Sequence, residues 1–429
     1  MIETADRPLP QARWWRIIPP AMLVYIFSFM DRTSTGFAIA GGMEKDLSLS
    51  ASTAGLVAGI FFIGYVILQA PGGHWAEHYS AKKFIGFSIL VWGGLTILCG
   101  FTQSATQLLI VRFLVGVAEG GVWPAMLVIL SHWFPDQERG RANAFFIMNI
   151  AVASIITGPL SGWIISNYGW RWVFIGEGLL SLALILVWFP LISDSPEKAK
   201  WISPEERAYL TSSLAAEQAR MKAVVAVPVS YRAVLRDLNL WKLTLLYFFY
   251  QIGIYGFAMW LPTLLQNLTA TGMTAVGLLS MFPYIAMIFG LYVFGRLSDR
   301  SGNRRRYTAL PILGFALCFL LSTLLNNNVS LSFGFFVACG LFMQSASGIF
   351  WTIPPMLFPS EVAGGVRGII NALGNLGGFI GPFAVGWLRT NLNSFDMGTY
   401  FLVGMLTIGF LIALSLPSKI DHANSLKAE

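Results

Sequence analysis

Charged residues are scarce in this sequence of 429 residues. Asp, Glu, Lys and Arg together make up 11% of it, whereas 55% is hydrophobic. Soluble globular chains carry about 25% charged residues, so the composition indicates a membrane protein. Cysteine is also scarce, and the three thiols, Cys99, Cys318 and Cys339, lie far apart inside apolar runs. This spacing indicates small buried side chains and implies no disulfide framework.

The sequence also lacks the motifs of metal, nucleotide and secretory proteins. It contains no HExxH, no CxxC and no Walker A motif, and none of its four histidines falls at the expected middle of a membrane helix. We therefore expect no metal, no cofactor and no enzymatic activity. The polar N-terminus has no signal-peptide core or cleavage site, so the first apolar helix is expected to remain as an anchor.

Apolar runs long enough to cross a bilayer, about 20 residues each, recur along the chain. If glycine, proline and charged residues are taken to mark the ends of these runs, the sequence predicts twelve spans: 16–40, 51–71, 84–102, 106–131, 142–166, 171–191, 240–265, 274–296, 307–325, 330–354, 368–390 and 398–417. The long polar segment 192–239 has no spanning run. The predicted fold class is an all-α membrane protein with six-helix halves at 1–191 and 240–429, joined by a cytoplasmic linker.

The positions of Lys and Arg predict the orientation through the positive-inside rule. With the N-terminus inside, the outer side receives only Lys45, Arg171 and Arg389. The inner side receives the basic residues of 198–242 and Arg7, Arg13, Arg16, Lys82, Lys83, Arg139, Arg141, Arg296, Arg300, Arg304, Arg305, Arg306, Arg367, Lys419 and Lys427. Both termini are therefore expected in the cytoplasm. The net charge of +7 then needs no nucleic acid to explain it.

An internal repeat relates the two halves. The segments 73–83 and 295–305, the Phe-Pro pairs at 134 and 358, and the Gly-Pro pairs at 158 and 381 recur at nearly one spacing. Parallel repeats of this kind are typical of transporters whose site lies between the repeats. The Gly-Pro pairs themselves are expected to serve close helix packing with a kink.

The repeated loop is a candidate cytoplasmic gate. Its second copy reads G-x-x-x-D-R-x-G-x-R-R, and its first copy is degenerate. Glycine permits close approach of helix ends, and a carboxylate can pair with arginine or a helix N-terminus. The alternative is a solvated basic loop that only fixes topology. The candidate gate residues are Gly73, Glu77, Gly295, Asp299, Arg300 and Arg304.

Four ionisable residues are predicted near mid-membrane in the first half. Asp31 and Arg32 lie in the apolar run 21–40, where each charge costs about 2.5–3.5 kcal/mol on insertion scales. Arg112 and Glu119 share one face of the run 106–131, about 10 Å apart along the axis. One interpretation is a neutral cluster holding two helices together. We favour a proton relay beside an anion site, because buried ion pairs seldom repay their desolvation.

Other polar residues are expected to face inward. Tyr65, Asn149, Gln251, Tyr255, Asn371 and Asn375 are candidate substrate contacts, although each alone more often joins helices by hydrogen bonds. Asn371 and Asn375 are four residues apart and share a helix face. Glu177 is predicted to be a structural partner of Arg171 near the outer surface.

These features resemble the major facilitator superfamily and, within it, the anion:cation symporter family of organic-anion transporters. The resemblance rests on the doubled loop and on FMDRTSTGFA, RFLVGVAEGG, WFPDQERG and GWRWVFIGEG. It implies that Asp31 and Glu119 are protonation sites and that Arg32 and Arg112 hold the substrate carboxylate. Tyr65 matches the tyrosine six residues before the Pro-Gly-Gly that ends the second span.

Two departures bear on the substrate. Sugar-acid members often have Tyr where this chain has Phe29, and Gln where it offers Asn149 or Ile150. The resemblance therefore leaves room for a less hydroxylated or aromatic acid. The expected function is proton-coupled symport of a small organic carboxylate by a monomer in a bacterial inner membrane. The alternative is an exporter or antiporter. A membrane enzyme would need a catalytic nucleophile or metal set, and none is visible in the sequence. A non-transporting sensor would have lost the four mid-membrane charges, and all four are retained.

Overall fold

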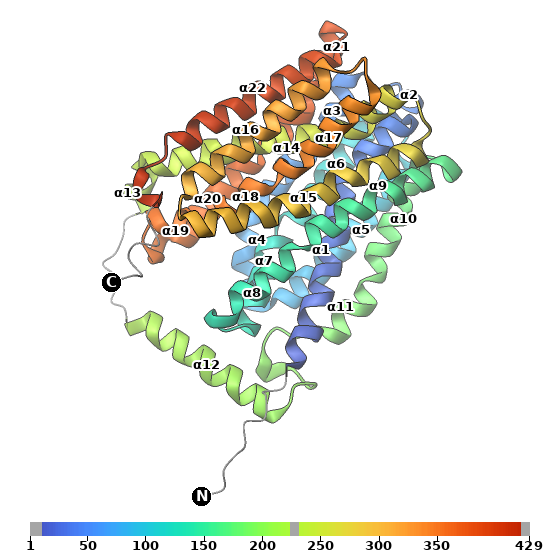
Figure 1. Ribbon diagram of the computed structural model, residues 1–429. Helices are drawn as coiled ribbons and strands as arrows, with labels where there is room; N and C mark the ends of the chain where they lie inside the picture. The colour runs from blue at the N-terminus through green and yellow to red at the C-terminus, as the bar shows by residue number, and fades with distance from the viewer. Residues whose placement is uncertain (1–10, 224–230, 422–429) are drawn as a thin grey trace, which may run out of the picture.

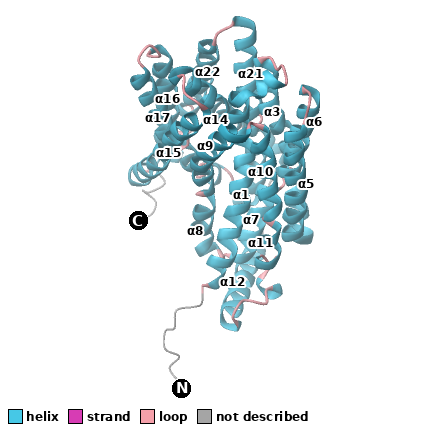
Figure 2. Cartoon of the chain, turned by 90° about the vertical axis from the view of Figure 1, so that its right-hand side faces the viewer, coloured by secondary structure: helices cyan, strands magenta, loops and turns pink. Residues whose placement is uncertain are grey.

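The protein consists of long helices that run roughly side by side. The computed structural model describes residues 11–223 and 231–421, and every regular element among them is helical (Figure 2). Ten helices are long and apolar enough to cross a membrane. The other two expected spans are α1 (Ala12–Ala38) and α3 (Ala51–Ile67), the latter a shorter apolar helix. The expected all-α membrane class is confirmed, and the described cysteines are free.

The first half contains six spans, several of them broken into two helices. After α1 and the turns η1 (Ile39–Met43) and α2 (Glu44–Asp46), α3 continues into α4 (Gln69–Trp75). The rest of this half comprises η2 (Ala76–Ser80), α5 (Ala81–Phe101), α6 (Ala105–Gly120), α7 (Val122–Trp133), α8 (Asp136–Ile147), α9 (Asn149–Tyr168), α10 (Arg171–Ala183) and α11 (Ile185–Leu191).

The linker and the second half are also built from helices. The linker holds η3 (Pro196–Lys198), α12 (Pro204–Ala223) and α13 (Tyr231–Arg236). The second half comprises α14 (Leu238–Thr269), α15 (Met273–Ser301), α16 (Arg304–Leu324), α17 (Val329–Met343), α18 (Ser345–Phe350), α19 (Pro354–Leu357), α20 (Ser360–Asn375), α21 (Gly377–Leu392), α22 (Phe395–Leu414) and η4 (Ser418–Asp421).

Two helix pairs form most of the contact between the halves. α9 packs along α15 and α3 packs along α21, while α1 also touches α14 (Figure 1). Glycines make these crossings close: a Cβ atom at Gly158 would lie 2.7 Å from the Gly277 carbonyl oxygen, and one at Gly59 would lie 2.8 Å from that of Phe379. The Gly-Pro pair of α9 therefore serves close packing, as expected.

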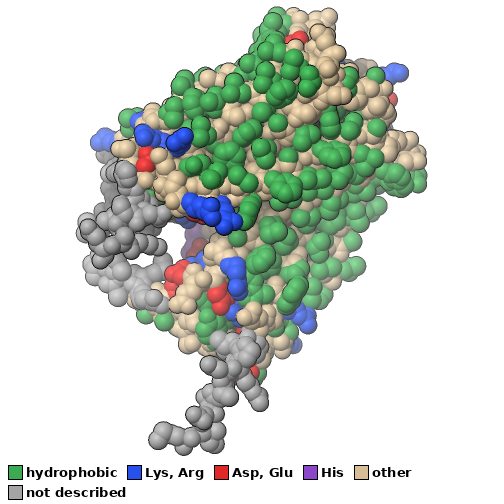
Figure 3. Space-filling view, in the orientation of Figure 1, with side chains coloured by type: hydrophobic (Ala, Val, Ile, Leu, Met, Phe, Trp, Pro, Cys, Tyr) green, Lys and Arg blue, Asp and Glu red, His purple; other side chains and the backbone are tan. Residues whose placement is uncertain are grey.

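The halves are tied together on the side opposite residues 11 and 421, the two ends of the described chain, and we call this the far side. Arg389 pairs with Glu44 at 3.0 Å, the Ser52 amide donates to Thr390 Oγ1 at 2.8 Å, and Ser166 bonds Thr274 at 2.8 Å. On the other side, the terminal side, Figure 3 shows a recess bordered by Lys, Arg, Asp and Glu side chains. The structure therefore represents a state that is joined at the far side and hollowed at the terminal side.

The linker helix α12 is fastened to the first half. Arg13 of α1 is buried between Glu206 of α12, at 2.6 Å, and Glu138 of α8, at 2.8 Å. Arg139 adds a 2.8 Å ion pair to Glu217. These contacts hold α12 on the terminal side beneath the first half (Figure 1).

Candidate functional site

The site is built on α1 where it crosses α6. Successive residues on a helix point about 100° apart, so Asp31 and Arg32 cannot face one partner. The structure confirms this divergence: each side chain meets a different residue of α6. Asp31, Arg32, Arg112 and Glu119 are all at most 3% exposed, and we call these four residues the charged cluster.

Asp31 belongs to the first of two ion pairs. Its Oδ2 atom lies 2.9 Å from Nη1 of Arg112, and Thr96 of α5 donates a 3.0 Å hydrogen bond to its Oδ1 atom. The Arg112 guanidinium also lies over the Phe61 ring, 5.3 Å from its centroid. Three helices thus converge on the Asp31 carboxylate.

Arg32 and Glu119 form the second ion pair. Their closest atoms, Nη2 and Oε2, are 3.1 Å apart, and Ser28 donates a 2.7 Å hydrogen bond to the same Oε2. The Arg32 guanidinium lies 4.4 Å from the Tyr65 ring centroid. A cation over a desolvated aromatic face gains about 2 kcal/mol. Tyr65 is therefore an aromatic support for Arg32.

The cluster retains unused hydrogen-bonding capacity. Among the described atoms, Nε and Nη2 of Arg112 and Oε1 of Glu119 are buried without a hydrogen-bond partner. Buried polar groups are nearly always paired in folded proteins. Both arginines could therefore accept a further anion if their carboxylate partners were neutralised.

Glu177 lies in a different place from the one expected. The prediction that it pairs with Arg171 near the surface is wrong, because Arg171 points to Asp46 at 3.8 Å and to the Thr102 carbonyl at 3.1 Å. Glu177 is instead buried in the first half, where its Oε2 atom accepts a 2.7 Å hydrogen bond from Ser34. Sequence proximity to Arg171 gave the wrong partner.

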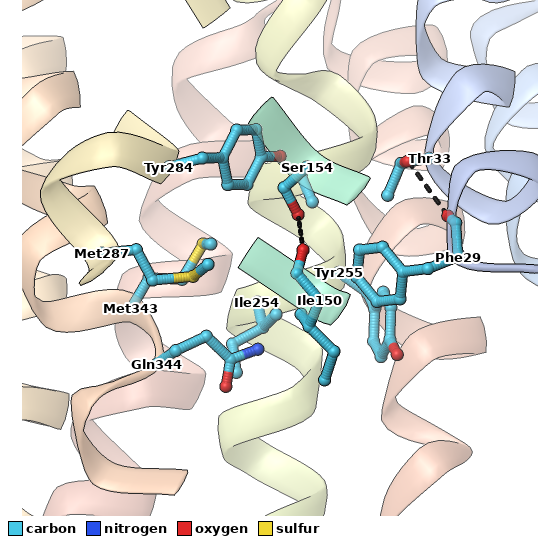
Figure 4. Close-up of a pocket in the computed structure, with 11 residues that line it drawn as sticks. Phe29, Thr33, Ile150, Ser154, Ile254, Tyr255, Tyr284, Met287, Met343 and Gln344 are labelled. Carbon is cyan, nitrogen blue, oxygen red and sulfur yellow. Dashed lines mark hydrogen bonds between the residues drawn. The ribbon is translucent and has the colours of Figure 1, made fainter. Parts of the chain in front are cut away.

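A small cavity lies between the halves. Its volume of about 20 Å³ is room for a water-sized molecule. Its lining side chains come from both halves (Figure 4): Phe29, Thr33, Ile150, Ser154, Ile254, Tyr255, Ala258, Tyr284, Met287, Met343 and Gln344. Apolar and aromatic groups predominate, and no charged side chain belongs to this described lining. Thr33 and Ser154 direct their hydroxyls to backbone carbonyls of their own helices.

Tyr255 is the predicted residue that lines this cavity. Its ring also packs on Phe62, with centroids 4.3 Å apart, so it contacts the first half. Asn149 does not line the cavity: it donates to the Phe146 carbonyl where α8 meets α9. The adjacent Ile150 takes the cavity position instead. Asn149 and Ile150 are adjacent on α9 and point about 100° apart, so they face different surroundings.

The remaining amides form a chain across the interface. Gln251 donates to Asn375 at 3.2 Å, Asn375 donates to Asn371 at 3.0 Å, and Asn371 donates to Gln69 of α4 at 3.0 Å. The shared face of Asn371 and Asn375 is confirmed. Gln69 was missed by sequence reasoning, although it lies two residues before the Pro-Gly-Gly of the second span.

The candidate gate residues lie on the terminal side. Asp299 and Arg304 form a 2.6 Å ion pair within the second half, and Gly302 ends α15 with a φ of +68°. Gly73 approaches Pro124, whereas a Cβ atom at Gly295 would meet nothing within 4 Å. Gly295 therefore makes no close helix contact in this state.

The first copy of the loop differs because Ser80 replaces the glycine. Ser80 has an extended φ of −158° and caps α5, and its hydroxyl bonds Asp194 at 2.7 Å. Glu77 lies in the π-helical turn η2, and Arg300 is exposed at the end of α15. The loop copies thus share position but differ in local structure.

Comparison with known proteins agrees with this architecture. A solved bacterial homologue of the human lysosomal transporter Spinster, in an inward-facing and occupied conformation, superposes with a TM-score of 0.76. It is 16% identical and covers 95% of this chain and 97% of its own. This similarity shows the fold.

Two curated bacterial relatives match nearly end to end. A quinolone resistance transporter of Acinetobacter baumannii is 31% identical, over 95% of this chain and 94% of its own length. A putative tartrate transporter of Agrobacterium vitis is 32% identical, over 94% and 90% respectively. The model described as Major Facilitator Superfamily matches residues 21–382. The chain therefore belongs to the major facilitator superfamily, with relatives among its organic-anion transporters.

Proposed function

We propose that this chain is a proton-coupled symporter of a small organic carboxylate. The observation that carries the proposal is the pairing of each arginine of the charged cluster with its own carboxylate. A substrate carboxylate can bind Arg32 or Arg112 only where the resident carboxylate gives way. Protonation of Asp31 and Glu119 removes that competition, so proton and anion each favour binding of the other.

The proposed cycle follows from this competition. With the far side open, Asp31 and Glu119 take protons and release the two guanidinium groups. The substrate carboxylate then pairs with Arg32 and Arg112, which suit carboxylates because of their forked donors. Loss of net charge at the interface lets the halves rock. Release of the protons on the terminal side restores the ion pairs and displaces the substrate.

The lining of the cavity bears on the substrate class. Tyr284, Met287 and Met343 come from the second half, and Phe29 and Ile150 come from the first. These groups favour contact with an apolar or aromatic body, whereas a polyhydroxylated acid needs many hydrogen-bond partners. We therefore place an aromatic or sparsely hydroxylated carboxylate ahead of a sugar acid. The amide chain of Gln251, Asn375 and Asn371 would change partners when the cavity widens.

We further propose that the protein acts as a monomer in a bacterial inner membrane, with both termini in the cytoplasm. The basic loops on the terminal side support this orientation through the positive-inside rule. The loop gate at Asp299 and Arg304 would then close the cytoplasmic side. The first and last residues of the chain, including Arg7 and Lys427, lie outside the described residues.

Uptake into proteoliposomes tests the function. An inward proton gradient is expected to drive accumulation of the right acid, and Glu119→Gln is expected to abolish accumulation while sparing exchange. The matched control is Glu205→Gln, which removes an exposed carboxylate of α12 and should behave as wild type. Continued accumulation by Glu119→Gln would show that Glu119 does not couple proton and substrate.

Export is the second candidate, because one relative is named a quinolone resistance transporter. The direction of the gradient effect distinguishes the two. If protons and substrate move in opposite directions, so that an outward proton gradient drives uptake, the protein is an antiporter and the symport proposal is wrong.

A further inference from the structure

Glu177 is a buried carboxyl group that the proposed cycle does not use. It lies on α10 and is 2% exposed. Its Oε2 atom accepts the hydrogen bond from Ser34, whereas its Oε1 atom is buried without a hydrogen-bond partner. A carboxyl group so placed cannot be a solvated surface charge.

Among the described residues, the helices packed around Glu177 offer it no free counter-charge. Asp31 of α1, and Arg112 and Glu119 of α6, lie within electrostatic range of it. α5, which packs on α10, contributes the uncharged Thr96 and Cys99 beside Asp31 and Arg112. The described residues of α9 and α11, which also pack on α10, carry no charged side chain.

Charge balance then assigns a proton. The charged cluster is neutral, because two arginines meet two carboxylates. An ionised Glu177 would leave one uncompensated negative charge inside the helix bundle, and such a charge neutralises itself rather than remain buried. A protonated Glu177 could donate to Ser34, whose hydroxyl lies 3.4 Å from the Asp31 carbonyl oxygen.

We infer that Glu177 stores a proton in the empty transporter and releases it when a monoanion binds. This inference rests on the proposed function. In the loaded state Asp31 and Glu119 are protonated, so two guanidinium charges face one substrate charge. An ionised Glu177 supplies the missing negative charge. Two protons arrive, one leaves Glu177, and the net uptake of about one proton per monoanion moves no charge.

A dianion gives a different balance. Its two carboxylates match both guanidinium groups, so Glu177 keeps its proton and the two protons taken up by Asp31 and Glu119 are both carried. Glu177 thus adjusts the number of protons to the charge of the substrate. Without it, a monoanion would be carried with an excess positive charge.

Infrared spectroscopy of the empty protein tests the stored proton without any substrate. We expect a carbonyl-stretch band of a protonated buried carboxyl group at neutral pH, lost in Glu177→Gln and kept in Glu119→Gln. Glutamate labelled with 13C in its side-chain carboxyl should shift the band in wild-type protein, which needs no variant. A band that is absent, unshifted, or retained in Glu177→Gln overturns the inference while leaving the symport proposal intact.

Charge movement tests the release of that proton. With 4-hydroxybenzoate as the monoanion probe on supported membranes, wild-type protein is expected to pass no net current. Glu177→Gln is expected to pass an inward positive current, and Glu177→Asp to behave as wild type. Equal currents in wild type and Glu177→Gln, zero included, contradict the release. Absence of proton coupling in wild-type proteoliposomes would instead reject the proposed function.

Discussion

Two adjacent side chains of α1 form separate ion pairs at the centre of this protein. Asp31 faces Arg112 and Arg32 faces Glu119, so one stretch of α1 supports two ion pairs at different positions around its axis. Breaking a buried ion pair by removing one partner costs about 3–5 kcal/mol. The pairs are therefore a strong constraint on this state, and in the proposed cycle protonation and substrate binding relieve it.

Arg32→Lys is expected to weaken substrate binding with little effect on folding. Lysine keeps the charge but loses the planar group that lies over Tyr65. The lost cation–π contact predicts a KM increase of about tenfold or more, measured as the concentration dependence of uptake. Tyr65→Phe keeps the ring face and should keep the wild-type KM, whereas Tyr65→Leu should resemble Arg32→Lys. An unchanged KM in Arg32→Ala would exclude Arg32 as the carboxylate anchor.

Charged residues of the site were predictable from sequence because charge within an apolar run is costly and conspicuous. The hydroxyl groups of Ser28, Ser34 and Thr96 that support them were not, since serine and threonine are tolerated anywhere in a membrane helix. Glu177 was singled out but assigned the wrong partner, because its burial depends on which face α10 turns toward α1. That rotation is set by packing with α5.

At the scale of helices, the contact between α9 and α15 depends on glycine. The two backbones approach so closely at Gly158 and Gly277 that no side chain fits between them. Gly158→Ala is expected to destabilise the protein by about 1–3 kcal/mol, as overpacking does, and to lower the thermal midpoint in detergent. This crossing joins the halves, so transport should slow as well.

Gly176→Ala is the matched control on another membrane helix. A Cβ atom at Gly176 of α10 would meet nothing within 4 Å, and alanine favours helix over glycine by up to about 1 kcal/mol. The thermal midpoint should therefore stay or rise. A fall equal to that of Gly158→Ala would show that the effect is general to glycine in these helices and unrelated to the crossing.

Helix positions were largely predictable, and helix breaks were not. Apolar runs bounded by charge and glycine gave the spans to within a few residues, and TM-length helices occupy them. The short interruptions at Leu68, Gly121 and Met148 were not predicted, because each lies inside a run predicted to be a single helix. Ile150 lines the cavity and Asn149 does not, because adjacent residues of a helix point in different directions.

At the scale of the whole molecule, the half-buried Glu44 makes the joined far side sensitive to pH. Burial raises the pKa of Glu44 above its ordinary value, even though Arg389 at 3.0 Å opposes the shift. A carboxyl whose pKa is higher in the closed state binds its proton more tightly there. Falling pH through that raised pKa therefore favours the closed far side, and rising pH weakens it.

Arg389→Ala is expected to open the far side, because it leaves Glu44 half-buried without its cation. The separation of spin labels at the exposed Gln103 and Asn391 should increase at pH 8 and shorten again at pH 5. Glu44→Gln alone should change little, and combining it with Arg389→Ala should restore the closed distances. If the spin-label distance in Arg389→Ala does not depend on pH, or stays long in the double variant, then Arg389 acts only through its packing on Phe395.

The two halves contribute unequally to the site. The charged cluster and Glu177 lie wholly in the first half, while among the described residues of the second half only Asp421, at the chain's end, is both buried and charged. The second half contributes most of the cavity wall, including Tyr284, Met287 and Met343. In the proposed cycle, the first half therefore holds the carboxyl groups that take protons and the arginines that bind the substrate carboxylate, while the second half forms most of the wall around the substrate body. If that cycle holds, substitutions in the second half can change which organic acid is accepted and leave the proton-binding carboxyl groups of the first half in place.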